Sequence, residues 1–142
     1  MRREQLEQYR SKKEEIRELQ YKLKHLGEGD SMIGNDVILD YSTGYPRPQS
    51  IVGVDWDKVN RTYERYVNKM ARLGKECEEI EEFVESIPDS LTRRIFRMYY
   101  IDGMTQEKVA KKIHLDRSRI SRKIDDFLKT HTKHTKHMYN NN

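Results

Sequence analysis

The residues with the clearest chemical potential lie between positions 117 and 123, where the sequence is RSRISRK. In a helix, four of them share one exposed face at i, i+1, i+4 and i+5, namely Arg117, Ser118, Ser121 and Arg122. A guanidinium group can donate to both major-groove acceptors of guanine, and a short hydroxyl can bond to a base edge or a phosphate. The pattern predicts contact with duplex DNA. The alternative is an ordinary three-helix bundle with a basic outer face.

The distribution of charge along the chain agrees with a polyanion-binding C-terminal part. Residues 88–142 hold 13 Lys or Arg and 6 Asp or Glu, whereas residues 1–87 hold 15 and 18. Charge alone fits a solvated Lys-rich surface equally well. We expect the DNA-binding residues to be Arg117, Ser118, Arg119, Ser121, Arg122, Lys123, Thr105, Lys108 and Lys111.

Other reactive residue types receive structural interpretations. His131, His134 and His137 lie three apart and could meet one metal ion on a helix, but a flexible Lys/His-rich tail that touches phosphates explains them better. Cys77 lacks a basic neighbourhood that would activate it, and we interpret it as a packing residue. The sequence contains no catalytic motif, so we expect no enzyme activity, no metal and no cofactor.

Residues 88–128 contain the signals of three short helices. We expect the first from about Ser90 to Ile101, with Gly103 in the left-handed position that ends it. Thr105 is the expected N-cap of a second helix that ends near Ile113. After a turn at His114 and Leu115, Asp116 should cap a third helix from Arg117 to about Leu128.

The buried positions of these helices follow from the same spacing. The first should bury Leu91, Ile95, Met98 and Tyr99, and the later ones Val109, Ile113, Leu115, Ile120, Ile124 and Phe127. Ala110 is small where the third helix must cross closely over the second.

Two longer helices are expected before this segment, at residues 3–26 and 55–87. The second begins after the N-cap Asp55, ends before Pro88, and has an uncharged stripe in strict 3-4 alternation. This heptad seam comprises Trp56, Val59, Tyr63, Tyr66, Met70, Leu73, Cys77, Ile80, Val84 and Ile87. Such a stripe must be buried, either against residues 3–26 or against a second copy of the chain.

Residues 27–54 separate these two helices and cannot continue either of them. They carry five of the seven glycines and two of the three prolines. The short β-prone runs 37–39 and 51–54 could pair as a hairpin, and an irregular loop is an equally good interpretation.

The segment IFRMYYIDGMTQEKVAKKIHLDRSRISRKIDDFLK resembles the helix-turn-helix of sigma-70 region 4. The match rests on Tyr99-Tyr100, Gly103, Thr105-Gln106-Glu107, Val109-Ala110 and Arg117 through Ile120. The order of segments is similar to that of small phage-encoded transcriptional regulators of the autolysin-regulator and late-gene activator groups. The resemblance implies a transcriptional regulator with double-stranded DNA as a partner and RNA polymerase as a further one. One departure is His114, where relatives often have Gly.

Together these features predict an all-α protein, in which a long helical coiled-coil hairpin (residues 1–87, with the loop 27–54) precedes a helix-turn-helix (88–128) and a flexible basic tail (129–142). The predicted function is sequence-specific DNA binding by helix 117–128, with possible homo-oligomerisation through helix 55–87. The alternatives are a small terminase subunit and a coiled-coil adaptor or anti-sigma-like protein binder. The single cysteine and the absence of a membrane-length apolar run predict a cytoplasmic location.

Overall fold

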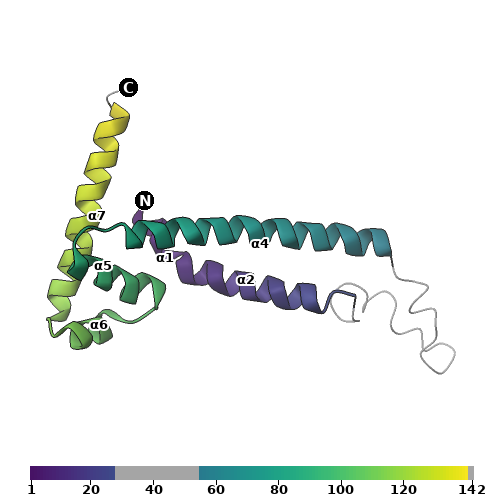
Figure 1. Cartoon of the computed structure of the whole chain (residues 1–142), viewed down its shortest axis with the longest axis horizontal. Helices are drawn as coiled ribbons and strands as arrows, with labels where there is room; N and C mark the ends of the chain where they lie inside the picture. Colours follow the sequence, from purple (N-terminus) through teal and green to yellow (C-terminus); the bar gives the residue numbers. More distant parts are fainter. Residues whose placement is uncertain (28–54, 141–142) are drawn as a thin grey trace. The chain divides into compact units, whose positions relative to one another are not determined.

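The computed structural model describes residues 1–27 and 55–140, with side chains up to His131, and in these ranges all regular structure is helical (Figure 1). The elements are α1 (Arg3–Glu7), α2 (Tyr9–Lys24), α4 (Trp56–Glu85), α5 (Ser90–Phe96), the π-helical turn η2 (Arg97–Ile101), α6 (Gln106–Ile113) and α7 (Arg117–Asn140). The predicted all-α class is confirmed for this part of the chain. The hairpin considered at 37–39 and 51–54 lies outside it.

Contacts divide the chain into two units. The first comprises residues 1–13 and 75–142, and the second comprises residues 14–74. The long helices α2 and α4 each contribute one part to each unit. The domain boundaries expected from the sequence, at residues 87 and 128, therefore do not coincide with the boundaries of these two units, at residues 13 and 74.

In the first unit, α5, η2, α6 and α7 form the helix-turn-helix core. Its fully buried side chains include Ile95, Phe96, Val109, Ile120 and Ile124, each at most 1% exposed. Asp89 caps α5 by accepting hydrogen bonds from the backbone N–H of Thr92 at 3.0 Å and from its hydroxyl at 2.7 Å. These two hydrogen bonds are the main reason that the pKa of Asp89 is lowered.

The end of the first short helix differs from the expected α-helix. The N–H of Asp102 bonds to the carbonyl of Arg97, five residues back, which makes η2 a π-helical turn. Within this wider turn Tyr100 is buried, and Tyr99, which was expected to be buried, is only half-buried. Likewise Thr92 and Phe96 are buried, whereas the expected Leu91 is half-buried. Ile113, Leu115 and Phe127 are also half-buried rather than buried.

The N-terminal residues and the second half of α4 complete the first unit. Leu6 and Tyr9 are 1% and 5% exposed, and Cys77, Ile80, Val84 and Ile87 are at most 2% exposed. The Tyr9 hydroxyl donates to Glu81 at 2.9 Å, and Lys12 Nζ lies 2.9 Å from Glu76 Oε2. The order of these contacts shows that α2 and α4 pack antiparallel here.

In the second unit the remaining parts of α2 and α4 also pack antiparallel. Lys69 Nζ lies 2.8 Å from Glu15 Oε2, and Lys22 Nζ lies 5.9 Å from the centre of the Tyr66 ring. Leu19, Val59, Thr62 and Leu73 are buried between the helices. Asp55 caps α4 as expected, because its carboxylate accepts from the N–H of Lys58 at 3.0 Å.

The expectation that the whole heptad seam is buried is wrong for its first half. From Leu73 to Ile87 every seam residue is buried, but Trp56 is 60% exposed and Tyr63 is 53% exposed. The reason is that α2 packs on the side of α4 that carries Val59 and Thr62. The neighbouring side, with Trp56, Tyr63 and Val67, is left in solvent.

Two helix ends also differ from expectation. A turn at Gln8 interrupts the expected helix 3–26, which becomes α1 and α2. The third helix of the helix-turn-helix continues to Asn140 instead of ending near Leu128, since residues 117–140 contain no Gly or Pro to stop it. The flexibility expected of residues 129–142 stays a prediction. No helix within the described ranges is long and apolar enough to cross a membrane.

Candidate nucleic-acid interface

The turn between α6 and α7 sets the geometry of the candidate interface. His114 has a left-handed backbone, with φ of 64° and ψ of 42°, and its N–H bonds to the carbonyl of Ala110. The same carbonyl accepts the N–H of Leu115 at 3.0 Å. These two bonds close the end of α6 and redirect the chain, so that α7 begins only three residues later. His114 therefore adopts the conformation that Gly would provide most easily.

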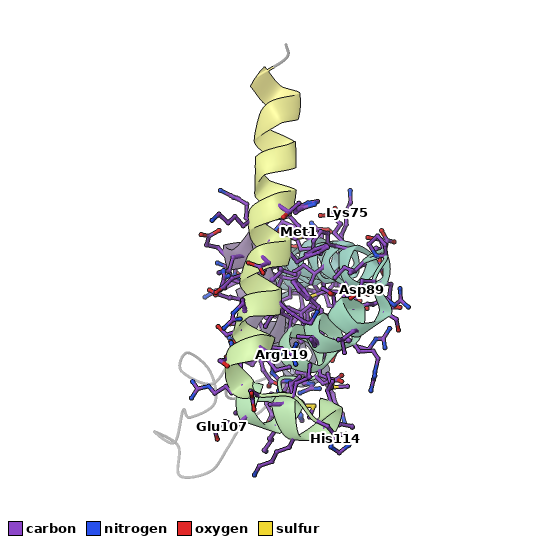
Figure 2. All side chains as sticks on the ribbon, turned by 90° about the vertical axis from the view of Figure 1, so that its left-hand side faces the viewer. Met1, Lys75, Asp89, Glu107, His114 and Arg119 are labelled. Atoms are coloured by element: carbon purple, nitrogen blue, oxygen red, sulfur yellow. The ribbon has the colours of Figure 1, made fainter. Side chains whose placement is uncertain are left out.

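The residues around this turn hold α6 and α7 together. Val109 is fully buried and Ala110 is 6% exposed, and on α7 Ile120 and Ile124 are at most 1% exposed. The Thr105 hydroxyl caps α6 by accepting from the N–H of Lys108 at 3.2 Å. In Figure 2, Glu107 and His114 mark the end of the first unit at which α6 lies.

The first two turns of α7 carry most of the predicted DNA-binding residues. Arg117, Ser118, Arg119 and Arg122 are all exposed, and Ser121 is half-buried. Because Ile120 and Ile124 define the buried side of α7, Ser118 and Arg122, which are four residues apart, lie on the opposite side. One short stretch of helix thus presents two serine hydroxyls and three guanidinium groups.

The exposed side of α6 carries two further predicted residues. Lys108 and Lys111 are both exposed and lie three residues apart, away from the buried Val109 and Ala110. Their position suits contact with a backbone phosphate rather than with a base, since α6 precedes the helix that would enter the groove.

A surface depression joins the starts of α6 and α7. It is lined by Tyr99, Thr105, Gln106, Glu107 and Arg117. Arg117 Nη1 lies 3.6 Å from Glu107 Oε1, and both side chains are about two-thirds exposed. An ion pair this long and this exposed contributes little to stability, so Arg117 can leave it for a stronger anion at low cost.

Lys123 is the one predicted residue that the structure places apart from the others on α7. It is half-buried, and its charge adds a minor lowering of the Asp89 pKa beyond the larger effect of the Thr92 hydrogen bonds. Lys123 therefore lies toward the start of α5 rather than beside Ser118 and Arg122.

The N-terminal segment is a part of this region that the sequence did not reveal. The Arg3 guanidinium forms an ion pair and hydrogen bond with Asp125, which follows Arg122 by three residues on α7. This bond is the main reason that the pKa of Arg3 is raised. Arg3 thereby neutralises a carboxylate next to the predicted DNA-binding face. The two residues are 122 positions apart, and no local pattern signals their pairing.

Arg10 makes a second contact between the N-terminal segment and a residue far along the chain. Its guanidinium covers Gly103, which has a φ of +74°, and a side chain at position 103 would collide with it. The turn before α6 thus favours Gly for its left-handed backbone conformation, whereas the exposed Arg10 side chain could move aside.

The other candidate sites have less support. Cys77 is 1% exposed, and its burial raises the pKa of the thiol, which disfavours the nucleophilic thiolate. His131 packs against the rings of Phe83 and Phe127, with ring centres 5.0 Å and 6.2 Å away. The side chains of His134 and His137 are outside the described part of the chain.

Comparisons with protein-family models, with curated proteins and with solved structures found no match for the chain.

Proposed function

We propose that the protein is a sequence-specific DNA-binding transcriptional regulator of the phage type, whose α7 enters the major groove. The observation that carries the proposal is the left-handed turn at His114, which joins two helices with buried Val109 and Ile120 while leaving Ser118 and Arg122 exposed. This is the arrangement in which a helix-turn-helix presents the first turns of its second helix to base edges.

The assignment of roles follows from exposure and position. Arg117 and Arg122 read base edges, since an extended guanidinium can donate two hydrogen bonds to guanine. Ser118 and Ser121 contact base edges or phosphates, and Lys108 and Lys111 neutralise phosphates along the backbone. RNA polymerase is a further partner in this proposal, on the strength of the resemblance to sigma-70 region 4 alone.

Selection of bound duplexes from a random pool, followed by variant binding measurements, tests the proposal. Arg122→Ala should lose about 1–3 kcal/mol on the selected site and much less on random duplex, because only the site offers the base contact. Lys108→Ala or Lys111→Ala should weaken both duplexes about equally. Arg94→Ala, which removes an exposed guanidinium from α5, is the matched control.

A folded Arg117→Ala/Arg122→Ala variant that still distinguishes the selected site from random duplex would contradict the assignment. Absence of any salt-dependent DNA binding by the unaltered protein would exclude DNA binding as a whole, since a log–log slope of about −4 to −8 is expected for several phosphate contacts. The adaptor or anti-sigma-like function would then be favoured.

A further inference from the structure

One face of α4, far along the chain from the helix-turn-helix, carries a row of cations. Lys58, Arg61, Arg65 and Arg72 follow one another at intervals of three, four and seven residues, and all four are exposed. In a helix these intervals place the side chains along one line. We call this row the basic stripe. It lies wholly within the second unit.

Within residues 1–27 and 55–131, whose side chains the structure describes, the side chains of the basic stripe form no ion pair. Among the described residues, no carboxylate oxygen lies within 4.0 Å of the side-chain nitrogens of Lys58, Arg61 or Arg72, whereas the ammonium group of their neighbour Lys69 pairs with Glu15 at 2.8 Å. Arg65 has the ring of Tyr66 as a neighbour, 5.9 Å away. Like charges one turn apart on a helix destabilise it by a few tenths of a kcal/mol per pair.

Among the described residues, the basic stripe also lies outside the packed side of α4. The buried side of this part of α4 is formed by Val59, Thr62 and Leu73, which face α2. Charge is sorted along α4 as well: residues 56–75 carry six cations and two carboxylates, and residues 76–85 carry six carboxylates and no cation. A solvated face that only kept the helix soluble would mix the two signs, as i,i+4 pairing favours.

The shape of the stripe indicates the class of ligand. With a rise of 1.5 Å per residue, the four cations cover about 21 Å along a straight axis. Three of them, Arg61, Arg65 and Arg72, line a shallow depression together with Glu64, Asn68 and Lys69, so four cations and one carboxylate surround it. A long, straight row of guanidinium groups without an apolar anchor suits a regularly charged backbone, and Arg binds phosphate through two parallel hydrogen bonds. A protein partner would instead need a buried apolar or aromatic centre.

We propose that the basic stripe of α4 binds the phosphate backbone of duplex DNA, as a second contact in addition to that of the helix-turn-helix. The identity of the polyanion rests on the proposed function, because a helix-turn-helix that holds DNA raises the concentration of DNA near every other surface of the same chain. The contact is with phosphates, so it adds affinity and salt dependence without adding sequence preference.

The test compares two triple variants of the full chain that lose the same charge. The first is Arg61→Gln/Arg65→Gln/Arg72→Gln, which removes three cations of the stripe. The control is Arg17→Gln/Lys22→Gln/Lys24→Gln, which removes three exposed cations of α2 in the same unit. Gln is a good helix former, so both should keep their helicity, which circular dichroism verifies. Binding to the selected duplex and to random duplex is measured across a range of salt concentrations.

The stripe variant should lose about 2 to 3 from the magnitude of the log–log salt slope on both duplexes, while the control changes it by less than about 1. The ratio between selected and random duplex should stay the same in both variants. Equal slopes for the stripe variant and the unaltered protein would overturn the proposal while leaving the role of α7 intact. A loss of binding to vesicles of anionic phospholipid with an unchanged DNA slope would overturn it in favour of a membrane surface.

Failure of the proposed function gives a different result. If the unaltered protein shows no preference among duplexes but the stripe variant still has the shallower slope, the stripe binds DNA and the base-reading role of α7 is wrong. If the control variant lowers the slope as much as the stripe variant, only net charge matters and the stripe is not a site.

Discussion

Leu73 and Tyr63 offer a direct test of how α4 is covered. Both belong to the heptad seam, but Leu73 is 5% exposed and Tyr63 is 53% exposed. If the packing is within one chain, Leu73→Ala should be costly and Tyr63→Ala nearly neutral. If a second copy covers the first half of the seam, both should be costly.

The expected magnitudes follow from burial. Removal of a buried Leu side chain costs about 2–5 kcal/mol, and a site between two helices should fall near the lower end, at about 2–3 kcal/mol. In Tyr63→Ala only the contacts of the covered half of the side chain are lost, and the higher helix propensity of Ala offsets part of that loss. The free energy of unfolding should therefore change by no more than about 0.5 kcal/mol.

Urea denaturation followed by far-UV circular dichroism measures the free energy of unfolding of both variants, and the fluorescence of the single Trp56 reports on the second unit. Light scattering at several protein concentrations gives the mass. A loss of stability for Tyr63→Ala equal to that for Leu73→Ala, together with a halved mass, would refute the packing within one chain. Equal stability of all three proteins would show that α2 does not cover Leu73.

Three further predictions concern the first unit. His114→Gly should raise the free energy of unfolding by about 0.5–1 kcal/mol in thermal or urea denaturation, because Gly adopts the left-handed turn at φ of 64° without steric cost; a loss of stability would contradict this. Tyr100→Phe should stabilise the protein by about 1 kcal/mol, because the buried Tyr100 hydroxyl has no hydrogen-bond partner among the described residues. Burial also raises the pKa of this hydroxyl to about 12. A lower melting temperature of the variant would show that the hydroxyl has a partner. Arg3→Gln should weaken DNA binding because it leaves the charge of Asp125 beside Arg122 uncompensated, and Asp125→Asn should restore binding in the double variant; failure of that rescue in a binding titration would refute the electrostatic explanation.

Features that depend on local chemistry could be predicted from the sequence. Asp55 and Thr105 cap their helices as expected, and Gly103 takes the expected left-handed conformation. His114 likewise adopts the left-handed turn that its place between two helices requires. In each case the backbone conformation limits the residue to a few types, so the residue type indicates the conformation.

Features that depend on which surfaces meet could not be predicted. The apolar surface of α4 that includes the heptad seam covers a wide arc of the helix. Periodicity alone does not show that α2 covers the side with Thr62 rather than the side with Tyr63. The π-helical turn that buries Tyr100 requires a bond five residues back, which no residue pattern near Arg97 announces. The pairing of Arg3 with Asp125 depends on the packing of the N-terminal helix against α7.

The candidate site shows the same division. The exposure of Ser118 and Arg122 followed from the spacing of Ile120 and Ile124, and the structure bears out that placement. Lys123, which follows Arg122 in the sequence, lies instead toward the start of α5. Charge marks a region, whereas burial of the neighbours decides which side chains point outward together.

The central claim is that an arginine of α7 reads a base in the major groove, and a double-mutant cycle between protein and DNA tests it most directly. Each guanine of the selected site is replaced in turn by 7-deazaguanine, which removes one major-groove acceptor and leaves base pairing intact. Affinity is then measured with the unaltered protein, with Arg117→Ala and with Arg122→Ala. At one guanine the two losses should be strongly non-additive, with a coupling of about 1–3 kcal/mol to one of the arginines. Additive losses at every guanine would show that neither arginine contacts the bases there.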